Sequence, residues 1–259
     1  MLSRLDRYWR VFGTALNFFV FGLGGILLRV LVFPLLNLLI RERQLRILLA
    51  RTVIRYAFRT FIGLLRGVGI LRYEITGLER LERHGLLILA NHPTLIDTVF
   101  LMAFVKRADC IVKSALWRNP FTHGPVRAAG YISNDSGVGL IEDCIDSLRG
   151  GSNLIIFPEG TRTPGSGAIT LKRGAANIAV RGVRNVTPIV IRCTPPMLGK
   201  GVKWWRVPSR KSHFRIEVQE DIDIRSFIDE ADSNVLAARH LTDYLQNYFI
   251  KENQRDAVA

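Results

Sequence analysis

The chain begins with a long apolar stretch. Residues 11–28 carry no charge, and after Arg29 the apolar run continues to Ile40. Eighteen helical residues extend about 27 Å, slightly less than the roughly 30 Å hydrocarbon core of a bilayer. Glycines gather at 22–25 and Pro34 follows, which favours a broken helix or a helical hairpin over one straight span. The pattern predicts a membrane-embedded hairpin. A single or double span, or an apolar helix buried on the protein's own domain, are the alternatives.

A second helical pattern covers residues 41–72. Arg51, Arg55 and Arg59 recur every four positions, and leucine, isoleucine and phenylalanine residues keep an apolar side. An Arg-rich amphipathic helix beside an apolar anchor is typical of a helix in the headgroup plane of a membrane. The alternative is a solvated face of an ordinary helix.

From residue 73 the pattern changes to short β-rich runs that alternate with helical stretches. The predicted strands are 73–76, 86–90, 110–113, 130–133, 154–157, 186–191 and 214–219; the predicted helices are 95–105, 139–148, 171–180 and 233–250. Alternation of this kind predicts an α/β fold with a largely parallel central sheet flanked by helices. We therefore expect a membrane-associated helical segment at 1–72 and an α/β domain at 73–259.

The distribution of charge distinguishes the classes of partner. The net charge is +14, and residues 1–72 hold twelve Arg against Asp6 and Glu42, a net +10. A nucleic-acid-binding domain would spread cations over a polar face with recognisable motifs, and none is found. The excess flanks the apolar stretch on both sides, which predicts an anionic membrane surface as partner and both flanks on the cytoplasmic side. The expected location is the cytoplasmic face of the inner (cell) membrane.

One candidate for catalysis lies where an apolar strand meets a helix. The strand at 86–90 is followed by Asn91, His92 and Pro93, and Asp97 falls in the first turn or so of the next helix. A carboxylate there can reach one imidazole nitrogen and leave the other free as a general base. A histidine before a helix is also often a capping or packing residue, so this spacing alone leaves both readings open.

A second polar turn follows the strand at 154–157. Pro158 ends the strand, Gly160 permits a tight turn, and Glu159 and Arg162 are delivered at its carboxyl end. Ligands of open α/β sheets bind at that edge, and arginine recognises phosphate or carboxylate through paired hydrogen bonds. A structural Glu–Arg pair is the alternative. Lys172 and Arg173 add two cations downstream.

The other chemically reactive residues show no catalytic spacing. Cys110, Cys144 and Cys193 have no metal-ligand spacing and fit a reducing compartment, where each is expected to be a small core residue. The remaining histidines are expected to be structural: His84, His123, His213 and His240.

Together the two turns resemble the glycerolipid acyltransferase family, of the 1-acylglycerol-3-phosphate acyltransferase type. The resemblance rests on Asn91-His92 with Asp97 and on the run from Phe157 to Arg162. Supporting matches are Lys113, the stretch 172–175 and the strand with Val186, Pro188 and Ile189, so the resemblance covers about residues 75–195.

The resemblance implies an O-acyltransferase of lipid biosynthesis. In such enzymes the histidine, paired with the aspartate, deprotonates a lipid hydroxyl, which attacks a fatty acyl thioester on coenzyme A or acyl carrier protein. His92 is then the base and Asp97 its orienting partner. Substrate binding is expected from Glu159, Gly160, Thr161, Arg162, Lys113 and Lys172. No cofactor, metal or acyl-enzyme is implied.

One position departs from the family pattern. Between the two turns the family commonly has a glycine, an apolar strand and an arginine thought to grip the acceptor phosphate. Here Asn134 and Asp135 stand where that cation is expected, and Arg127 is the nearest candidate to compensate. The departure leaves open a lyso-lipid with another headgroup, such as a lyso-aminolipid. A phosphate-handling hydrolase or a non-catalytic membrane adaptor are the alternatives from other classes.

A cationic, aromatic loop follows the last matched strand. Residues 200–211 hold five Lys or Arg residues around Trp204 and Trp205. Such a loop suits a membrane interface or the docking of an acidic carrier protein. It also resembles a platform for single-stranded nucleic acid, or a loop whose indoles pack on the core.

Overall fold

A computed structural model describes residues 2–119, 122–135 and 137–255 of the chain. In that part a seven-stranded sheet runs in the order β1-β7-β6-β2-β5-β3-β4. The strands are β1 (Leu71–Thr76), β2 (Leu87–Ala90), β3 (Ala108–Val112), β4 (Ile132–Ser133), β5 (Asn153–Ile156), β6 (Val186–Thr194) and β7 (Ser212–Val218). All neighbours are parallel except β6 and β7, which confirms the expected largely parallel sheet.

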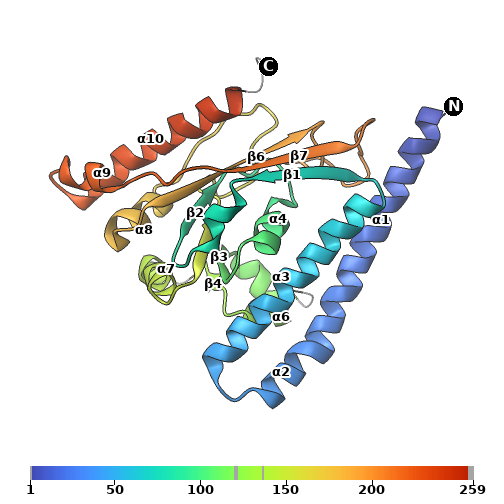
Figure 1. The fold of residues 1–259 in the computed structure, drawn as a ribbon, viewed down its shortest axis with the longest axis horizontal. Coiled ribbons are helices and arrows are strands. Elements are labelled where there is room, and N and C mark those ends of the chain that lie inside the picture. The colour runs from blue at the N-terminus through green and yellow to red at the C-terminus, as the bar shows by residue number, and fades with distance from the viewer. Residues whose placement is uncertain (1, 120–121, 136, 256–259) are drawn as a thin grey trace.

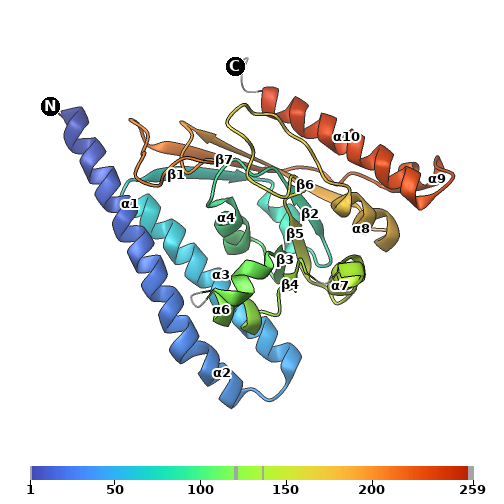
Figure 2. The ribbon, with the colours of Figure 1, turned by 180° about the vertical axis from the view of Figure 1, so that it is seen from behind.

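Helices cover both faces of the sheet (Figures 1 and 2). They are α1 (Leu2–Leu27), α2 (Phe33–Leu39), α3 (Arg43–Gly67), α4 (Asp97–Phe104), α5 (Ser114–Arg118), α6 (His123–Ala128), α7 (Leu140–Arg149), α8 (Gly174–Gly182), α9 (Arg225–Asp229) and α10 (Asn234–Gln254). A π-helical turn (Leu28–Val32) joins α1 to α2, and 3-10 turns occupy Leu78–Glu82 and Gly137–Gly139.

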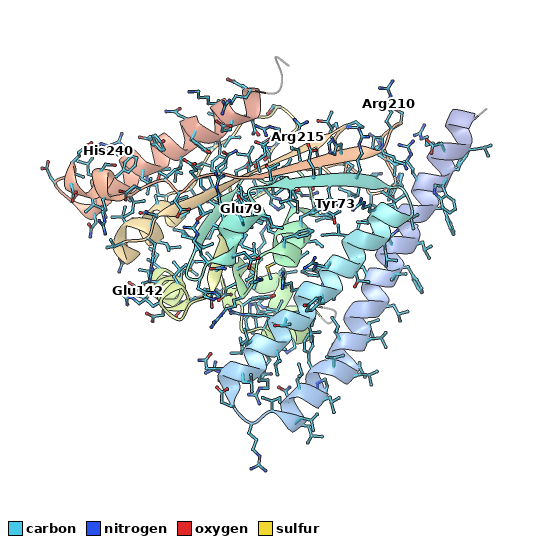
Figure 3. All side chains as sticks on the ribbon, viewed as in Figure 1. Tyr73, Glu79, Glu142, Arg210, Arg215 and His240 are labelled. Atoms are coloured by element: carbon cyan, nitrogen blue, oxygen red, sulfur yellow. The ribbon has the colours of Figure 1, made fainter. Side chains whose placement is uncertain are left out.

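The alternation of side chains along β2 divides the interior into two cores. Ile88 and Ala90 join the core under α3 and α4, whereas Leu87 and Leu89 join the core under α7, α8 and α10. Burial on both faces explains why β2 reads as an unbroken apolar run, as strands of parallel sheets do. Tyr73 of β1 packs against Phe100 and Phe104 of α4, whereas Arg215 on β7 pairs with Glu74 (Figure 3).

The N-terminal segment forms one long helical rod instead of the expected break at the glycines. The helix continues through residues 22–25, widens into the π-turn at 28–32 and continues past Pro34 to Leu39. Pro34 is the second residue of α2, so the N–H that it lacks falls where the hydrogen-bond pattern changes from π-helical to α-helical. The prediction of a hairpin inside residues 11–40 was wrong, because the chain reverses only at residues 40–42, between α2 and α3.

This rod exposes its apolar side chains. Leu5–Leu39 is long and apolar enough to cross a membrane, with a mean hydropathy of 2.3 in its most apolar window, and only 6% of that window is buried. The alternative of a helix buried on the protein's own domain was therefore wrong. The buried side of α1 is instead polar and includes Arg10, Thr14 and Asn17.

Helix α3 packs one side against the core and exposes Arg59 and Arg66 on the other, which agrees with the alternative of an ordinary helix with a solvated face. Its placement in the headgroup plane of a membrane stays a prediction. Ile54, Phe61 and Ile62 are buried in the core that also holds α4. Arg51 does not face solvent: its Nη2 atom lies 2.7 Å from Oδ2 of Asp109, with the two side chains 10% and 3% exposed. The division at residues 72 and 73 stays a prediction, and β1 already begins at Leu71.

Candidate active site

His92 and Asp97 come together at the carboxyl end of β2. Ala90 ends the strand, residues 91–96 form the connecting loop, and Asp97 is the first residue of α4. The Nδ1 atom of His92 lies 2.9 Å from Oδ2 of Asp97. The Asp97 side chain is fully buried, and that of His92 is 16% exposed. This contact holds one ring nitrogen and leaves Nε2 for a substrate.

Thr94 completes the surroundings of the Asp97 carboxylate. Its backbone N–H donates to Oδ2 at 2.6 Å, and its hydroxyl donates to Oδ1. Burial raises the pKa of Asp97 above its usual value, and the hydrogen bonds from His92 and Thr94 act against that shift. The local sequence contains a signal for Thr94, because a threonine three residues before an acidic residue at a helix start is spaced to hydrogen-bond with it.

The turn after β5 lies beside the His92 loop and is hydrogen-bonded to it. The backbone N–H of His92 donates to Oε1 of Glu159 at 3.0 Å, and the hydroxyl of Thr163 donates to the same oxygen at 2.8 Å. The N–H of Thr163 donates to the carbonyl of His92 at 2.7 Å. Phe157 stacks on the imidazole, with ring centroids 4.1 Å apart. Glu159 is buried, and burial raises the pKa of its carboxyl.

The expected binding cations occupy different places around this pair. Arg162 donates from Nη1 to the carbonyl oxygens of Leu198 and Gly199, at 3.0 and 2.9 Å. Lys172 lies over Gly160, whose φ is +68° and whose added Cβ would lie 2.9 Å from the lysine Cε. A side chain at position 160 would therefore be strained and would displace the lysine.

Thr161 and Lys113 lie further out. Thr161 is exposed in the same turn as Glu159. Lys113 is exposed at the carboxyl end of β3, and β5 separates that strand from β2. The structure thus brings His92, Asp97, Glu159, Arg162 and Lys172 into one region and places Lys113 along the same edge of the sheet.

Comparisons with known proteins agree with this arrangement. A family model described as Acyltransferase matches residues 72–192, the region that holds both turns. Residues 72–192 of this chain are therefore similar to the acyltransferase family. The fold of the chain also matches the crystal structure of a 1-acyl-sn-glycerophosphate acyltransferase from Thermotoga maritima, with a TM-score of 0.70 over 98% of both chains at 19% identity.

Curated relatives are similar to the central part of this chain. A 1-acyl-sn-glycerol-3-phosphate acyltransferase of Pseudomonas aeruginosa is 30% identical over 54% of this chain and 56% of its own. A protein of the same name from Helicobacter pylori is 33% identical over 46% of this chain and 55% of its own. The chain therefore spans about half the length of the curated relatives it matches.

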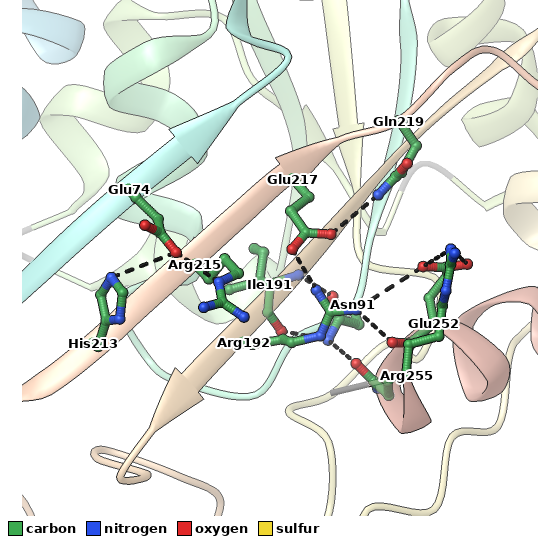
Figure 4. Close-up of polar contacts among 11 residues, drawn as sticks. Glu74, Asn91, Ile191, Arg192, His213, Arg215, Glu217, Gln219, Glu252 and Arg255 are labelled. Carbon is green, nitrogen blue, oxygen red and sulfur yellow. Dashed lines mark hydrogen bonds and ion pairs between the residues drawn. The ribbon is translucent and has the colours of Figure 1, made fainter. Parts of the chain in front are cut away.

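Asn91 attaches the loop that carries His92 to the neighbouring strand. Its amide oxygen accepts from the N–H of Ile191 at 2.7 Å, and its amide nitrogen donates to the carbonyl of the same residue at 2.8 Å (Figure 4). The β2–β6 ladder reaches Ala90 and Ile189, so this buried side chain continues the pairing where the backbone of β2 departs.

The next residue of β6 connects this region to the end of α10. Arg192 contacts the Glu217 carboxylate at 2.8 Å and donates to the carbonyl of Glu252 (Figure 4). Sequence reasoning missed this link, because the two partners lie 25 and 60 residues further along the chain. It missed Thr163 and Phe157 as neighbours of His92 for the same reason.

The position expected to lack a phosphate-binding arginine is a structural turn. The Asn134 side chain accepts from the N–H of Ser114 at 2.8 Å, at the start of α5. Arg127 is exposed on α6, a helix that packs on α3. Compensation by Arg127 stays a prediction.

Proposed function

We propose that this chain is a membrane-associated O-acyltransferase that moves a fatty acyl group from a thioester to the hydroxyl of a lysophospholipid such as 1-acylglycerol-3-phosphate. The observation that carries the proposal is the contact between His92 Nδ1 and the buried Asp97. A fixed tautomer with Nε2 available is the arrangement that a general base requires. The named relatives support this acceptor class.

The reaction needs only one base and one carbonyl. Nε2 of His92 takes the proton of the lipid hydroxyl as its oxygen attacks the thioester carbon. Asp97 stabilises the imidazolium that forms. Collapse of the tetrahedral intermediate forms the ester and breaks the C–S bond, and the imidazolium returns its proton to the departing sulfur. Backbone amides or a nearby cation would stabilise the oxyanion.

The cations along this edge of the sheet would hold the acceptor phosphate. Lys172 lies over Gly160, and Arg162 uses one of its nitrogens for the loop carbonyls, which leaves guanidinium donors for an anion. Acyl-CoA and acyl carrier protein present the same thioester, and either can serve as donor in this mechanism.

A second acceptor class has one observation in its favour. Asn134 and Asp135 replace the expected cation, and the Asn134 amide is engaged by Ser114. A lyso-lipid that carries no phosphate monoester, such as a lyso-aminolipid, would not need that cation.

Membrane association would come from the exposed face of α1 and α2. Phe12, Phe19 and Leu23 are 58%, 68% and 47% exposed. Aspartate at these three positions would remove apolar contact with lipid while leaving the buried side of α1 unchanged. Fractionation of cells, and sedimentation of the purified protein with vesicles, should then show a shift toward the soluble fraction. Because arginines flank the apolar stretch on both sides, we expect the protein to lie on the cytoplasmic face of the cell membrane.

The decisive test is His92→Ala in detergent, with acyl thioesters and a panel of lyso-lipids. We expect thiol release and lipid product to fall together by about 10² to 10⁴-fold, the usual contribution of a general base. His240→Ala, on the exposed side of α10, is the matched control. Undiminished lipid product in His92→Ala would refute the base assignment. Thiol release without lipid product in the unmodified protein would indicate a hydrolase.

A further inference from the structure

The loop between β6 and β7 carries a cationic, aromatic surface whose use is open. We call residues Lys200–Lys211 the Trp204 loop. Every residue from Lys200 to Arg206 is exposed, and the loop has no acidic residue. Trp204 and Trp205 are 41% and 47% exposed and meet edge to face, with centroids 5.5 Å apart. Paired indoles this exposed, among cations, need an apolar and anionic partner.

The Trp204 loop lies along α1. The ring of Trp204 meets that of Phe18 edge-on, with centroids 6.5 Å apart. Closer to the N-terminus of α1, Arg10 donates from Nη1 to the carbonyl of Pro208 at 3.4 Å. Arg210, near the loop's end, lies toward the N-terminal end of α1 in Figure 3. The loop therefore packs on the side of α1 that is turned toward the domain, beside the exposed apolar face that we assign to the membrane.

The residues just before the Trp204 loop, Leu198 and Gly199, are hydrogen-bonded to the loop after β2 and to the turn after β5. The N–H of Leu95, three residues after His92, donates to the carbonyl of Leu198 at 3.1 Å. Arg162 donates to Leu198 and Gly199, as described above. Leu95 is itself 48% exposed. A displacement of the Trp204 loop would be transmitted to the His92 loop through these bonds.

We propose that the Trp204 loop is a second membrane contact, which docks its indoles and cations at headgroup depth on an anionic leaflet and sets the active site against the lipid surface. Tryptophan prefers the interface between headgroups and acyl chains, and the five cations complement anionic lipid. The Nη1 bonds of Arg162 would then link the Trp204 loop to the turn after β5, which is bonded to the His92 loop through Glu159. The inference rests on the membrane association proposed above.

A fluorescent probe at position 205 tests the contact directly. Trp205→Cys, labelled with an environment-sensitive dye, is mixed with vesicles of phosphatidylcholine and phosphatidylglycerol. Native thiols should not compete, because burial raises the pKa of all three cysteines, to about 12 for Cys144 and Cys193. The control label is Val235→Cys, at a residue 73% exposed at the start of α10.

We expect a blue shift at position 205, quenching by headgroup-level brominated lipid, and neither effect at position 235. No change at 205 in protein that sediments with the vesicles would overturn the proposal. A shift that requires acyl carrier protein and is absent with vesicles would overturn it in favour of carrier docking. The fluorescence shift and the quenching are measured without turnover, so a failure of the proposed reaction is distinguished from a failure of this membrane contact.

Charge reversal tests the functional consequence. In Lys200→Glu/Lys203→Glu/Arg206→Glu we expect the ratio of activity on anionic vesicles to activity in micelles to fall by at least about tenfold, since each cation contributes to binding an anionic leaflet. The matched control reverses three exposed cations elsewhere, Arg149, Arg239 and Lys251, and should keep the ratio. An equal ratio in both variants would contradict the proposal.

Discussion

The carboxylate of Glu159 accepts a hydrogen bond from the backbone N–H of His92, at 3.0 Å. The Thr163 hydroxyl donates to the same oxygen, and the Thr163 N–H donates to the His92 carbonyl. The turn after β5 is therefore bonded to the loop after β2 that carries His92. Sequence reasoning assigned Glu159 to the acceptor site, whereas in the structure its Oε1 atom holds the loop that carries the imidazole.

A positioning role for Glu159 predicts a specific kinetic pattern. Glu159→Ala leaves the His92 amide without its acceptor, so kcat should fall by about 10² while the KM for the acceptor changes little. Glu159→Gln keeps an oxygen for that amide and should retain most of kcat. Steady-state kinetics of both variants in detergent are the measurement. If both variants instead raise KM alike, Glu159 acts on the acceptor.

Asp97→Asn should impair catalysis without removing the fold. An amide at this position can donate to Nδ1, which selects the tautomer with the proton on Nε2 and removes the base. We expect kcat to fall by about 10³ to 10⁴-fold, which is the size of loss expected when a general base is held in the wrong tautomer. Circular dichroism and gel filtration should match the unsubstituted protein. Activity within about threefold of that protein would contradict the tautomer argument.

The same substitution predicts a pH dependence of stability. Burial raises the pKa of Asp97 above 3.8, so the folded state holds its proton more tightly than the unfolded state does. The unsubstituted protein therefore loses stability as pH rises from 3.8 through the raised pKa. Asparagine does not titrate, so the Tm of Asp97→Asn relative to the unsubstituted protein should rise across that window.

Asp221→Asn provides a control of opposite sign. Hydrogen bonds from Arg83 hold the pKa of Asp221 below 3.8, so that carboxyl contributes stability above this pH and loses it as pH falls. The Tm of Asp221→Asn relative to the unsubstituted protein should therefore fall as pH rises. Parallel trends in the two variants would show that the Asp97 argument is wrong.

The sequence predicted those parts of the fold that depend on local pattern. All seven strands and the four predicted helices are present, because apolar runs bounded by turns record burial on the sheet. The break predicted at the glycines of residues 22–25 failed, since glycine lowers helix propensity by only about 1 kcal/mol and flanking apolar residues continue the helix. The direction in which Arg51 points was also missed, because its partner Asp109 lies 58 residues away.

The same distinction holds for the site. His92 and Asp97 are close in sequence and share one strand-to-helix turn, so their pairing could be predicted. The contacts of Arg162 with Leu198 and Gly199 depend on how the β6–β7 connection folds back, and no local pattern contains that information. Asn91 was quoted only as part of a motif, and its bonds to Ile191 depend on the order of strands in the sheet.

Asn91 is expected to matter through these bonds to Ile191. Asn91→Ala would leave a buried N–H and carbonyl of β6 unpaired, at a cost of about 1–3 kcal/mol for each group. We expect a lower Tm and a lower kcat, because the loop that carries His92 loses its attachment to β6. Asn91→Asp keeps an acceptor for the Ile191 N–H, so its Tm and kcat should lie between those of the unsubstituted protein and those of Asn91→Ala. Thermal melts and kinetics in detergent measure both effects, and an unchanged Tm in Asn91→Ala would refute the argument.

The buried pair of Arg51 and Asp109 predicts a strongly asymmetric stability effect. Arg51 also donates to the Ala129 carbonyl and the Ser152 hydroxyl, and Asp109 accepts from Ser147 and from the N–H of Cys110. Arg51→Met should lower the free energy of unfolding by about 3–5 kcal/mol, because it leaves a buried carboxylate without its counter-charge.

Arg51→Met/Asp109→Asn should recover part of that loss, since asparagine carries no charge. Its Oδ1 can accept from the Cys110 N–H, and its Nδ2 can donate to the Ser147 hydroxyl oxygen. The loss in the single variant should also shrink at acid pH. Burial already raises the pKa of Asp109, and protonation removes the unpaired charge. Denaturant unfolding of both variants at two pH values tests this. A double variant less stable than Arg51→Met at neutral pH would show that the attachment of α3 depends on the remaining hydrogen bonds of Asp109 instead of on charge pairing.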